Sequence, residues 1–122
     1  MEWLLVFLGG GIGSLLRYGT ARILPEIDLS TGDFPYSTLL ANLLACLILG
    51  AGLALLSRDA LTRNQSLLLL TGLCGGFSTF STFSAELLNL YEAGYPSVAV
   101  LYLVASLLSG LAAVAVGLAL LR

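Results

Sequence analysis

The sequence predicts an all-α integral membrane protein with four transmembrane helices. Of its 122 residues, 58% are hydrophobic and 10% are charged, and the mean hydropathy is +1.00. An ordinary soluble domain carries about 25% charged residues, so this chain has too few charges to cover a water-exposed surface. The formal charge of −2 also provides no basic surface for a nucleic acid. The composition therefore excludes a disordered chain, a nucleic-acid-binding protein and a soluble enzyme.

Four apolar stretches are long enough to cross a bilayer. A hydrocarbon core about 30 Å thick requires roughly 20 residues of helix, at about 1.5 Å each. Residues 3–24, 34–57, 64–90 and 95–121 each meet that length and are joined by short loops. We expect residues 1–122 to form a single transmembrane domain. The start, Met-Glu-Trp, lacks the basic region of a cleavable signal peptide, so the first stretch is expected to stay in the membrane.

The first segment is rich in glycine and carries Arg17 deep in the span. A charged side chain at this depth either extends to the nearer interface or lines an aqueous vestibule, where it attracts anions. Both interpretations stay open at this point. Gly9 and Gly13 place small residues on one helix face, which is typical of tightly packed membrane helices.

The second and fourth segments carry polar side chains at membrane depth. Asn42 lies in the middle of the second segment, where its amide can bond a neighbouring helix or donate to a permeating anion. Tyr102, Ser106 and Ser109 share one face of the fourth segment. Serines in such a position either bond their own helix or line a path of hydroxyl groups.

The third segment carries the strongest signal. The paired glycines Gly75 and Gly76 weaken a helix at mid-membrane, and the Ser and Thr residues that follow can bond the freed backbone groups. We therefore expect the third helix to be broken near Gly75-Gly76. Irregular backbone at this depth survives only where protein or a water-filled cavity shelters it.

Two stripes of side chains are expected beyond the break. The first contains phenylalanines at every third position, and the second contains hydroxyls and one carboxylate at spacings of three and four. The members are Phe77, Phe80 and Phe83 in the first stripe, and Thr79, Thr82 and Glu86 in the second. A phenylalanine stripe alone usually means core packing, but its alternation with polar groups beside a broken helix is less usual.

Neutral hydrogen-bond donors and one positive charge therefore recur at membrane depth. Asn, Ser, Thr and Tyr side chains donate hydrogen bonds, and the edges of Phe rings carry positive quadrupole. These groups suit a small, hard anion that must shed water without being bound too tightly. They do not suit a cage for a metal cation, which needs several carboxylates. Without His, and with only Cys46 and Cys74, a zinc or haem site is not expected, and both cysteines are expected to be small buried side chains.

Over its whole length the sequence resembles the Fluc/CrcB family of fluoride channels. The most specific match is the run from Gly75 to Phe83, Gly-Gly-Phe-Ser-Thr-Phe-Ser-Thr-Phe. The other matching stretches are Gly9-Gly10-Gly11-Ile12-Gly13 through Arg17-Tyr18, Pro35-Tyr36-Ser37-Thr38-Leu39 through Asn42, and Tyr102 with Ser106.

The resemblance implies a passive channel, not an enzyme, that exports cytoplasmic fluoride through the cell membrane and gives fluoride resistance. It implies an antiparallel, dual-topology homodimer with two fluoride pathways and one structural Na⁺ at the subunit interface. Backbone carbonyls of Gly75 and Ser78 would bind Na⁺, and Arg17 would lie in the vestibule. The fluoride pathway would contain Asn42, Phe80, Phe83, Ser81, Thr79, Thr82, Glu86, Tyr102 and Ser106. The expected partners are fluoride, the lipid bilayer and a second copy of the chain.

Two other classes of protein remain as alternatives. A small dual-topology multidrug or cation transporter also has four helices, but it needs a carboxylate inside its first helix. The only acid there is Glu2, at the very end. The other alternative is a structural membrane subunit. Such a role does not explain why hydroxyl side chains and phenylalanines lie in register beside a broken helix.

The arginines give a weak signal for orientation. Arg58, Arg63 and Arg122 are expected on the same side of the membrane as the N-terminus, whereas Arg22 faces the other side. The positive-inside rule therefore favours cytoplasmic termini, by a margin of a few residues that permits insertion in either orientation.

Overall fold

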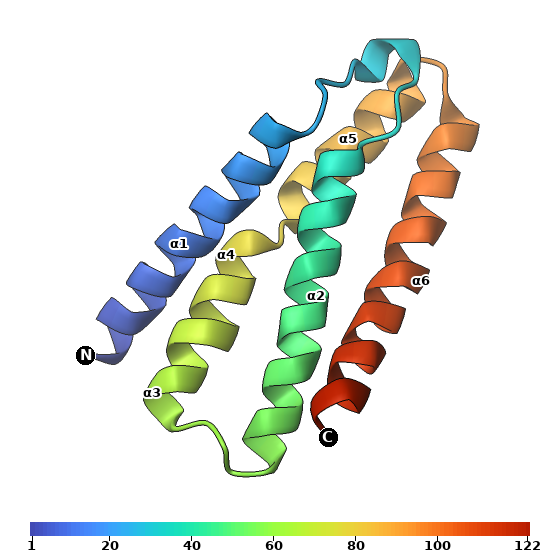
Figure 1. The fold of residues 1–122 in the computed structure, drawn as a ribbon. Coiled ribbons are helices and arrows are strands. Elements are labelled where there is room, and N and C mark those ends of the chain that lie inside the picture. The colour runs from blue at the N-terminus through green and yellow to red at the C-terminus, as the bar shows by residue number, and fades with distance from the viewer.

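A computed structural model describes all residues, 1–122, and contains only helices and their connections (Figure 1). Four helical spans are long and apolar enough to cross a membrane, which confirms the predicted fold class. Three spans are single helices, and the other is divided into four pieces. The single helices are α1 (Glu2–Ile23), α2 (Tyr36–Ser57) and α6 (Pro96–Leu121), and the pieces are α3 (Arg63–Ser66), η2 (Leu67–Cys74), α4 (Gly75–Phe77) and α5 (Phe80–Glu92). A short 3₁₀ turn, η1 (Leu29–Thr31), lies in the first connection.

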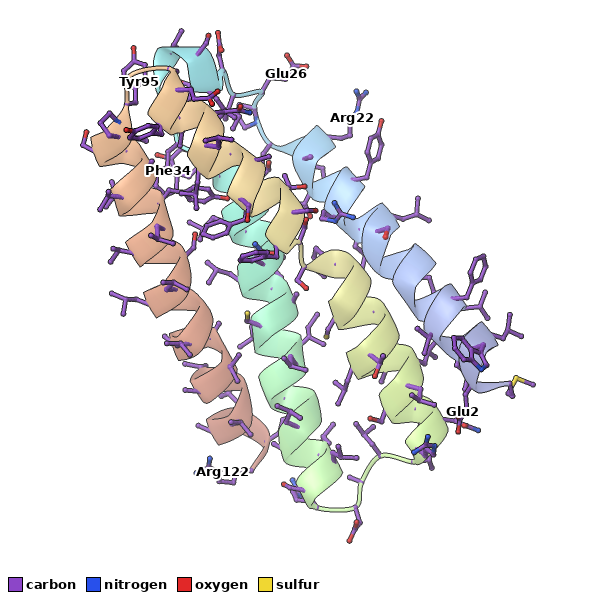
Figure 2. All side chains as sticks on the ribbon, turned by 180° about the vertical axis from the view of Figure 1, so that it is seen from behind. Glu2, Arg22, Glu26, Phe34, Tyr95 and Arg122 are labelled. Carbon is purple, nitrogen blue, oxygen red and sulfur yellow. The ribbon has the colours of Figure 1, made fainter.

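Successive spans run in opposite directions, so both termini lie at one end of the bundle together with the connection from α2 to α3 (Figure 1). Figure 2 shows Glu2 and Arg122 at that end, and Arg22 and Glu26 at the opposite end. An exposed ion pair, with 2.8 Å between Arg63 Nε and Glu2 Oε1, joins the start of α1 to α3. The predicted distribution of arginines between the two ends therefore agrees with the structure.

Glycines bring the backbone of α1 into direct contact with the third span. A Cβ at Gly9 would lie 2.2 Å from the carbonyl oxygen of Leu68, and a Cβ at Gly76 would lie 2.3 Å from that of Gly10. No real side chain fits at such distances, so only glycine permits this approach. The predicted tight packing of small residues is what holds the first span on the third.

After the short helix α3, the third span has an unusual winding. Its segment η2 is a π-helix, whose i→i+5 hydrogen bonds give a wider turn than that of an α-helix. The span is then broken, as predicted, but the two non-helical residues are Ser78 and Thr79. Gly75 and Gly76 stay helical, whereas the backbone of Ser78 (φ −82, ψ 157) and Thr79 (φ −150, ψ 120) is extended. Gly76 is required for contact with α1 and stays helical, and the break begins after Phe77, at Ser78.

Of all the helices, α2 carries the most buried residues, and the larger apolar cluster joins α5 to α6. Phe83, Leu90, Ala99 and Tyr102 form the larger cluster. Many large apolar side chains on the outer faces of the bundle are exposed, as expected where a helix faces lipid. Of the two cysteines, Cys74 is buried and Cys46 is half-buried, and neither forms a disulfide.

Candidate functional site

A polar cavity of about 440 Å³ lies beside the break, lined by residues of α1, α2 and the third span. The structure brings together four residues that the sequence singled out: Arg17, Thr79, Thr82 and Glu86. Three further hydroxyl side chains, to which no role was assigned from the sequence, also line this cavity, namely Ser14, Ser37 and Thr38. The cavity therefore combines hydroxyl donors, one guanidinium and one carboxyl group.

The carboxyl group of Glu86 is buried, with 9% of the residue exposed, and receives two hydrogen bonds. Thr38 Oγ1 donates to one carboxyl oxygen over 3.0 Å, and Tyr102 Oη donates to the other over 2.9 Å. A buried carboxyl group requires such partners, because an unpaired one is costly to remove from water. Three helices, α2, α5 and α6, thus meet at Glu86. Thr38 could have been found in the sequence, because it lies four residues before Asn42 and shares its helix face.

Arg17 is half-buried and lines the cavity. Its Nε donates to the carbonyl oxygen of Gly76 over 3.2 Å. Arg17 therefore lies at the wall of a cavity inside the bundle, bonded to the backbone of a neighbouring span. The bond also joins α1 to the third span just before the break.

Asn42 bonds the backbone of the break itself, at Thr79. The N–H of Thr79 donates to Asn42 Oδ1 over 2.8 Å, and Asn42 Nδ2 donates to the carbonyl oxygen of Thr79 over 3.4 Å. The carbonyl oxygens of Ser78 and Thr79 accept no backbone N–H. Both functional ends of the Asn42 amide are therefore directed at one backbone residue.

Phe80 and Phe83 lie on a second cavity, of about 380 Å³, together with Asn42, Ser78 and Ser106. Phe80 is 79% exposed, whereas Phe83 is buried, and their ring centroids are 6.2 Å apart. The predicted stripe of three phenylalanines is wrong in one member. Phe77 precedes the break and packs with Ala41 and Ala45 instead, because the extended residues interrupt the helical register.

The remaining hydroxyl groups differ in their partners. Ser109 Oγ donates to the carbonyl of Ala105 in its own helix, which is the simpler of the two roles considered for it. Ser106 Oγ is buried and has no hydrogen-bond partner within the chain. Ser81 Oγ lies 3.4 Å from Thr79 Oγ1 at an exposed position beside the break.

Gly75 and Ser78 lie together at a smaller cavity of about 180 Å³, which Cys46 and Cys74 also line. A Cβ at Gly75 would meet no atom of the chain within 4 Å, unlike one at Gly76. Nothing inside a single chain therefore requires glycine at position 75.

The fold and the site define a class: a small four-helix membrane protein whose broken third span separates a cavity of hydroxyl groups from an exposed phenylalanine. Residues 4–118 match the family described as CrcB-like protein, Camphor Resistance (CrcB), and the chain belongs to this family. The predicted resemblance is thereby confirmed.

Relatives of known name cover nearly the whole chain. A protein of Phocaeicola vulgatus named fluoride-specific ion channel FluC is 44% identical over 116 residues, which are 94% of this chain and 93% of the relative. Proteins of the same name are 42% identical in Azobacteroides pseudotrichonymphae (93% of this chain, 90% of the relative) and 44% identical in Thermus thermophilus (90% and 86%).

Proposed function

We propose that this chain is a passive, fluoride-selective channel that exports cytoplasmic fluoride and so gives fluoride resistance. The observation that carries the proposal is the 440 Å³ cavity of hydroxyl groups and Arg17 beside a broken span, in a chain whose full-length relatives are named fluoride-specific ion channels. Hydrogen fluoride is a weak acid that crosses membranes and dissociates inside the cell. A passive pore relieves the resulting accumulation, and transport of this kind involves no catalysis.

The chemistry of the cavity suits a small anion. Hydroxyl groups donate hydrogen bonds that replace water around fluoride, and the guanidinium of Arg17 attracts negative charge into the membrane. The cavity holds no ring of cations that would trap an anion, and conduction requires that a bound ion can leave. The proposed pathway continues to the edges of the Phe80 and Phe83 rings and to the unpartnered hydroxyl of Ser106.

An antiparallel homodimer in the cell membrane is part of the proposal. Asn42, Ser78 and Ser106 lie beside the 79% exposed Phe80 on an open cavity, and polar groups at membrane depth are costly to leave facing lipid. A second copy inserted in the opposite orientation would cover the cavity that holds Phe80, Asn42 and Ser106. The small arginine bias between the two ends permits both orientations.

We include one structural Na⁺ at the axis of that dimer. The carbonyl of Ser78 accepts no backbone N–H, and the position of Gly75 is open, so backbone oxygens are available on this face. Two carbonyls from each subunit, those of Gly75 and Ser78, would surround a small hard cation, for which backbone oxygens at a helix break are suitable ligands. The donor set therefore fits Na⁺.

A small multidrug transporter is less well supported. Such a transporter needs a carboxylate within its first span, and the only acid of α1, Glu2, is at the helix end in an ion pair with Arg63. Glu86, the buried carboxyl, lies on α5 and is held by two hydroxyl groups.

Efflux from liposomes tests the proposal. Purified protein should release fluoride, read with a fluoride electrode, and should not release chloride. Equal efflux of the two ions would contradict the selectivity, and efflux of neither would favour the transporter or the structural subunit. Disruption of the gene should make cells sensitive to fluoride.

A further inference from the structure

We infer that a groove beside the connection from α1 to α2 receives the C-terminal end of α6 from a second, antiparallel copy. In this arrangement the carboxylates of Glu26 and Asp33 face Arg122 of the partner subunit, and the same contact occurs on both sides of the membrane. The inference rests on the homodimer that is part of the proposed function, and it specifies two surfaces of that dimer that lie outside the fluoride pathway.

The groove has a volume of about 900 Å³ and lies between the first connection, the start of α2 and α6. Most of its lining is apolar and includes Leu40, Leu43 and Leu101. Glu26 and Asp33 line the same groove, and both are exposed on the first connection. An exposed apolar hollow with charged groups in its lining is typical of a surface that binds another protein.

The groove is continuous with the surface that the proposed dimer covers. It shares Leu39 and Leu43 with the cavity that holds Phe80. That cavity in turn shares Cys46 and Ser78 with the smaller cavity beside the break. One hollow face therefore runs along α2 from the break to the first connection, and a second copy that covers the Phe80 cavity also reaches the groove.

The lengths of α6 on either side of the break match this arrangement. The proposed two-fold axis passes the break at the level of Cys46, which lines both cavities there. A Cβ at Gly110 would lie 3.7 Å from Cys46 Sγ, so Gly110 marks the same level on α6. Val98 in the groove and Arg122 at the chain end each lie 12 residues from Gly110, or about 18 Å of helix at about 1.5 Å per residue. A two-fold rotation therefore brings Arg122 of the partner subunit to the level of the groove.

The C-terminal half of α6 carries an apolar row that suits the groove. Leu111 and Val114 line the Phe80 cavity, and Leu111 is 71% exposed. Leu118 and Leu121 continue the row at spacings of four and three residues, so the four side chains share one helix face. This row ends beside Arg122, and it places apolar side chains where the groove is apolar and a positive charge where the groove is acidic.

The charges at the two ends of the bundle are complementary. Figure 2 shows Glu26 at one end and Arg122 at the other. Arg58 Nη1 donates to the carbonyl oxygen of Leu121 over 2.8 Å, so a second arginine is held at the C-terminal end of α6. Antiparallel pairing therefore places basic groups beside the acidic groove, whereas parallel pairing would place like charges together.

Neither acid of the groove has an arginine partner in its own chain, because the only ion pair joins Arg63 to Glu2. Exposed ion pairs contribute little to affinity. The charges are therefore expected to set the orientation of the two copies, while the apolar row supplies the contact area.

Zero-length cross-linking tests the contact. The chain contains no lysine, so Arg122→Lys introduces a single side-chain amine. A carbodiimide couples an amine only to a carboxylate that it touches, with loss of water. In vesicles of phosphatidylethanolamine and phosphatidylglycerol, the variant should give at least about tenfold more covalent dimer than the natural protein, because the two groups are held together. Mass spectrometry should place the link at Glu26 or Asp33, and Glu26→Gln with Asp33→Asn should remove it.

Arg63→Lys is the matched control, because it places an amine at the same end of the bundle but beside Glu2 of its own chain. It should couple within the chain and give no additional dimer. Glu26 lies at the opposite end of the bundle from Arg122, so a link between these positions can form only between two copies.

Three outcomes of the cross-linking would overturn the inference. The first is that Arg122→Lys gives no more covalent dimer than Arg63→Lys. The second is a dimer linked through Glu2 or Asp59, which would indicate parallel copies. The third is coupling of Glu26 and Asp33 to the lipid amine without any link to position 122, which would show that lipid occupies the groove.

Fluoride efflux from the same vesicles separates this inference from the proposed function. Efflux without the link to the first connection would leave the channel function intact and refute the contact. The link without efflux in the natural protein would establish the contact and refute the channel function.

Discussion

Removal of the Tyr102 hydroxyl should destabilise the protein by an amount that the structure allows us to state. Tyr102 is fully buried, and its Oη donates to Glu86 Oε1 over 2.9 Å. In Tyr102→Phe the ring keeps its edge contacts with Phe83 and Phe34, whose centroids lie 5.0 and 5.3 Å away. The change therefore removes one hydrogen bond and little packing.

The size of the loss depends on the charge of Glu86. A bond to a neutral carboxyl group contributes about 0.5–1.5 kcal/mol, and a bond to a carboxylate contributes about 1.5–3 kcal/mol. The free energy of unfolding should therefore fall by about 0.5 to 3 kcal/mol in Tyr102→Phe. A loss near the upper end would indicate that Glu86 is ionised in the folded protein, and a loss near the lower end that it is neutral. Thr38→Val, which removes the second donor, should fall in the same range.

The assay is equilibrium unfolding in mixed micelles, followed by circular dichroism, with fluoride efflux measured on the same preparations. Tyr91→Phe is the control, because Tyr91 is 66% exposed. Efflux should fall in Tyr102→Phe and not in Tyr91→Phe, since the carboxyl group at the wall of the polar cavity loses its fixed orientation. If the two variants unfold alike, the hydroxyl of Tyr102 does not hold Glu86 and the reasoning fails.

Three further predictions concern contacts along the third span and the face that holds Phe80. Gly9→Val should lower the free energy of unfolding by about 1–3 kcal/mol or more and reduce the yield of folded protein. Gly11→Val should be tolerated, because a Cβ at Gly11 meets nothing within 4 Å. Equal unfolding curves for the two variants would contradict the contact between α1 and the third span. Exchange of Na⁺ for a large organic cation should lower fluoride efflux, and Gly75→Leu should abolish both efflux and dimer formation; unchanged efflux and dimer mass would refute the Na⁺ site. Phe80→Ile should reduce fluoride flux at least about tenfold, because the ring quadrupole is lost. Phe7→Ile is the control, since Phe7 on α1 is also highly exposed, at 75%. Equal flux in the two variants would mean that Phe80 contributes only apolar surface.

The number of spans and the kinds of group in the site were predictable because they depend on local sequence. Length and composition set the spans, and Arg17, Asn42 and Glu86 stand out because polar groups are rare at that depth. The proximity of Thr79, Thr82 and Glu86 followed from helical spacing within one segment, and the structure places all three on one cavity.

What the sequence could not give depends on contacts between spans. The break was expected near the glycines, but Gly76 is held helical against α1 and the extended residues come later. The register of Phe77 changed for the same reason. The pairing of Asn42 with Thr79 and the π-winding of η2 could not be predicted, because both require knowledge of how α1 and α2 approach the third span.

The bond from Arg17 to Gly76 has a consequence for the electrostatics of the cavity. A long flexible side chain normally moves with the ion it attracts and loses conformational entropy as it does so. Here Nε is tied to a backbone oxygen, while the remaining N–H groups of the guanidinium are not engaged by this bond. The charge is therefore held at the cavity wall before any ion arrives, and in the proposed pathway it would provide a standing potential instead of a mobile arm that carries the ion. An anion on that pathway would pass a fixed positive field and leave it unchanged for the next one.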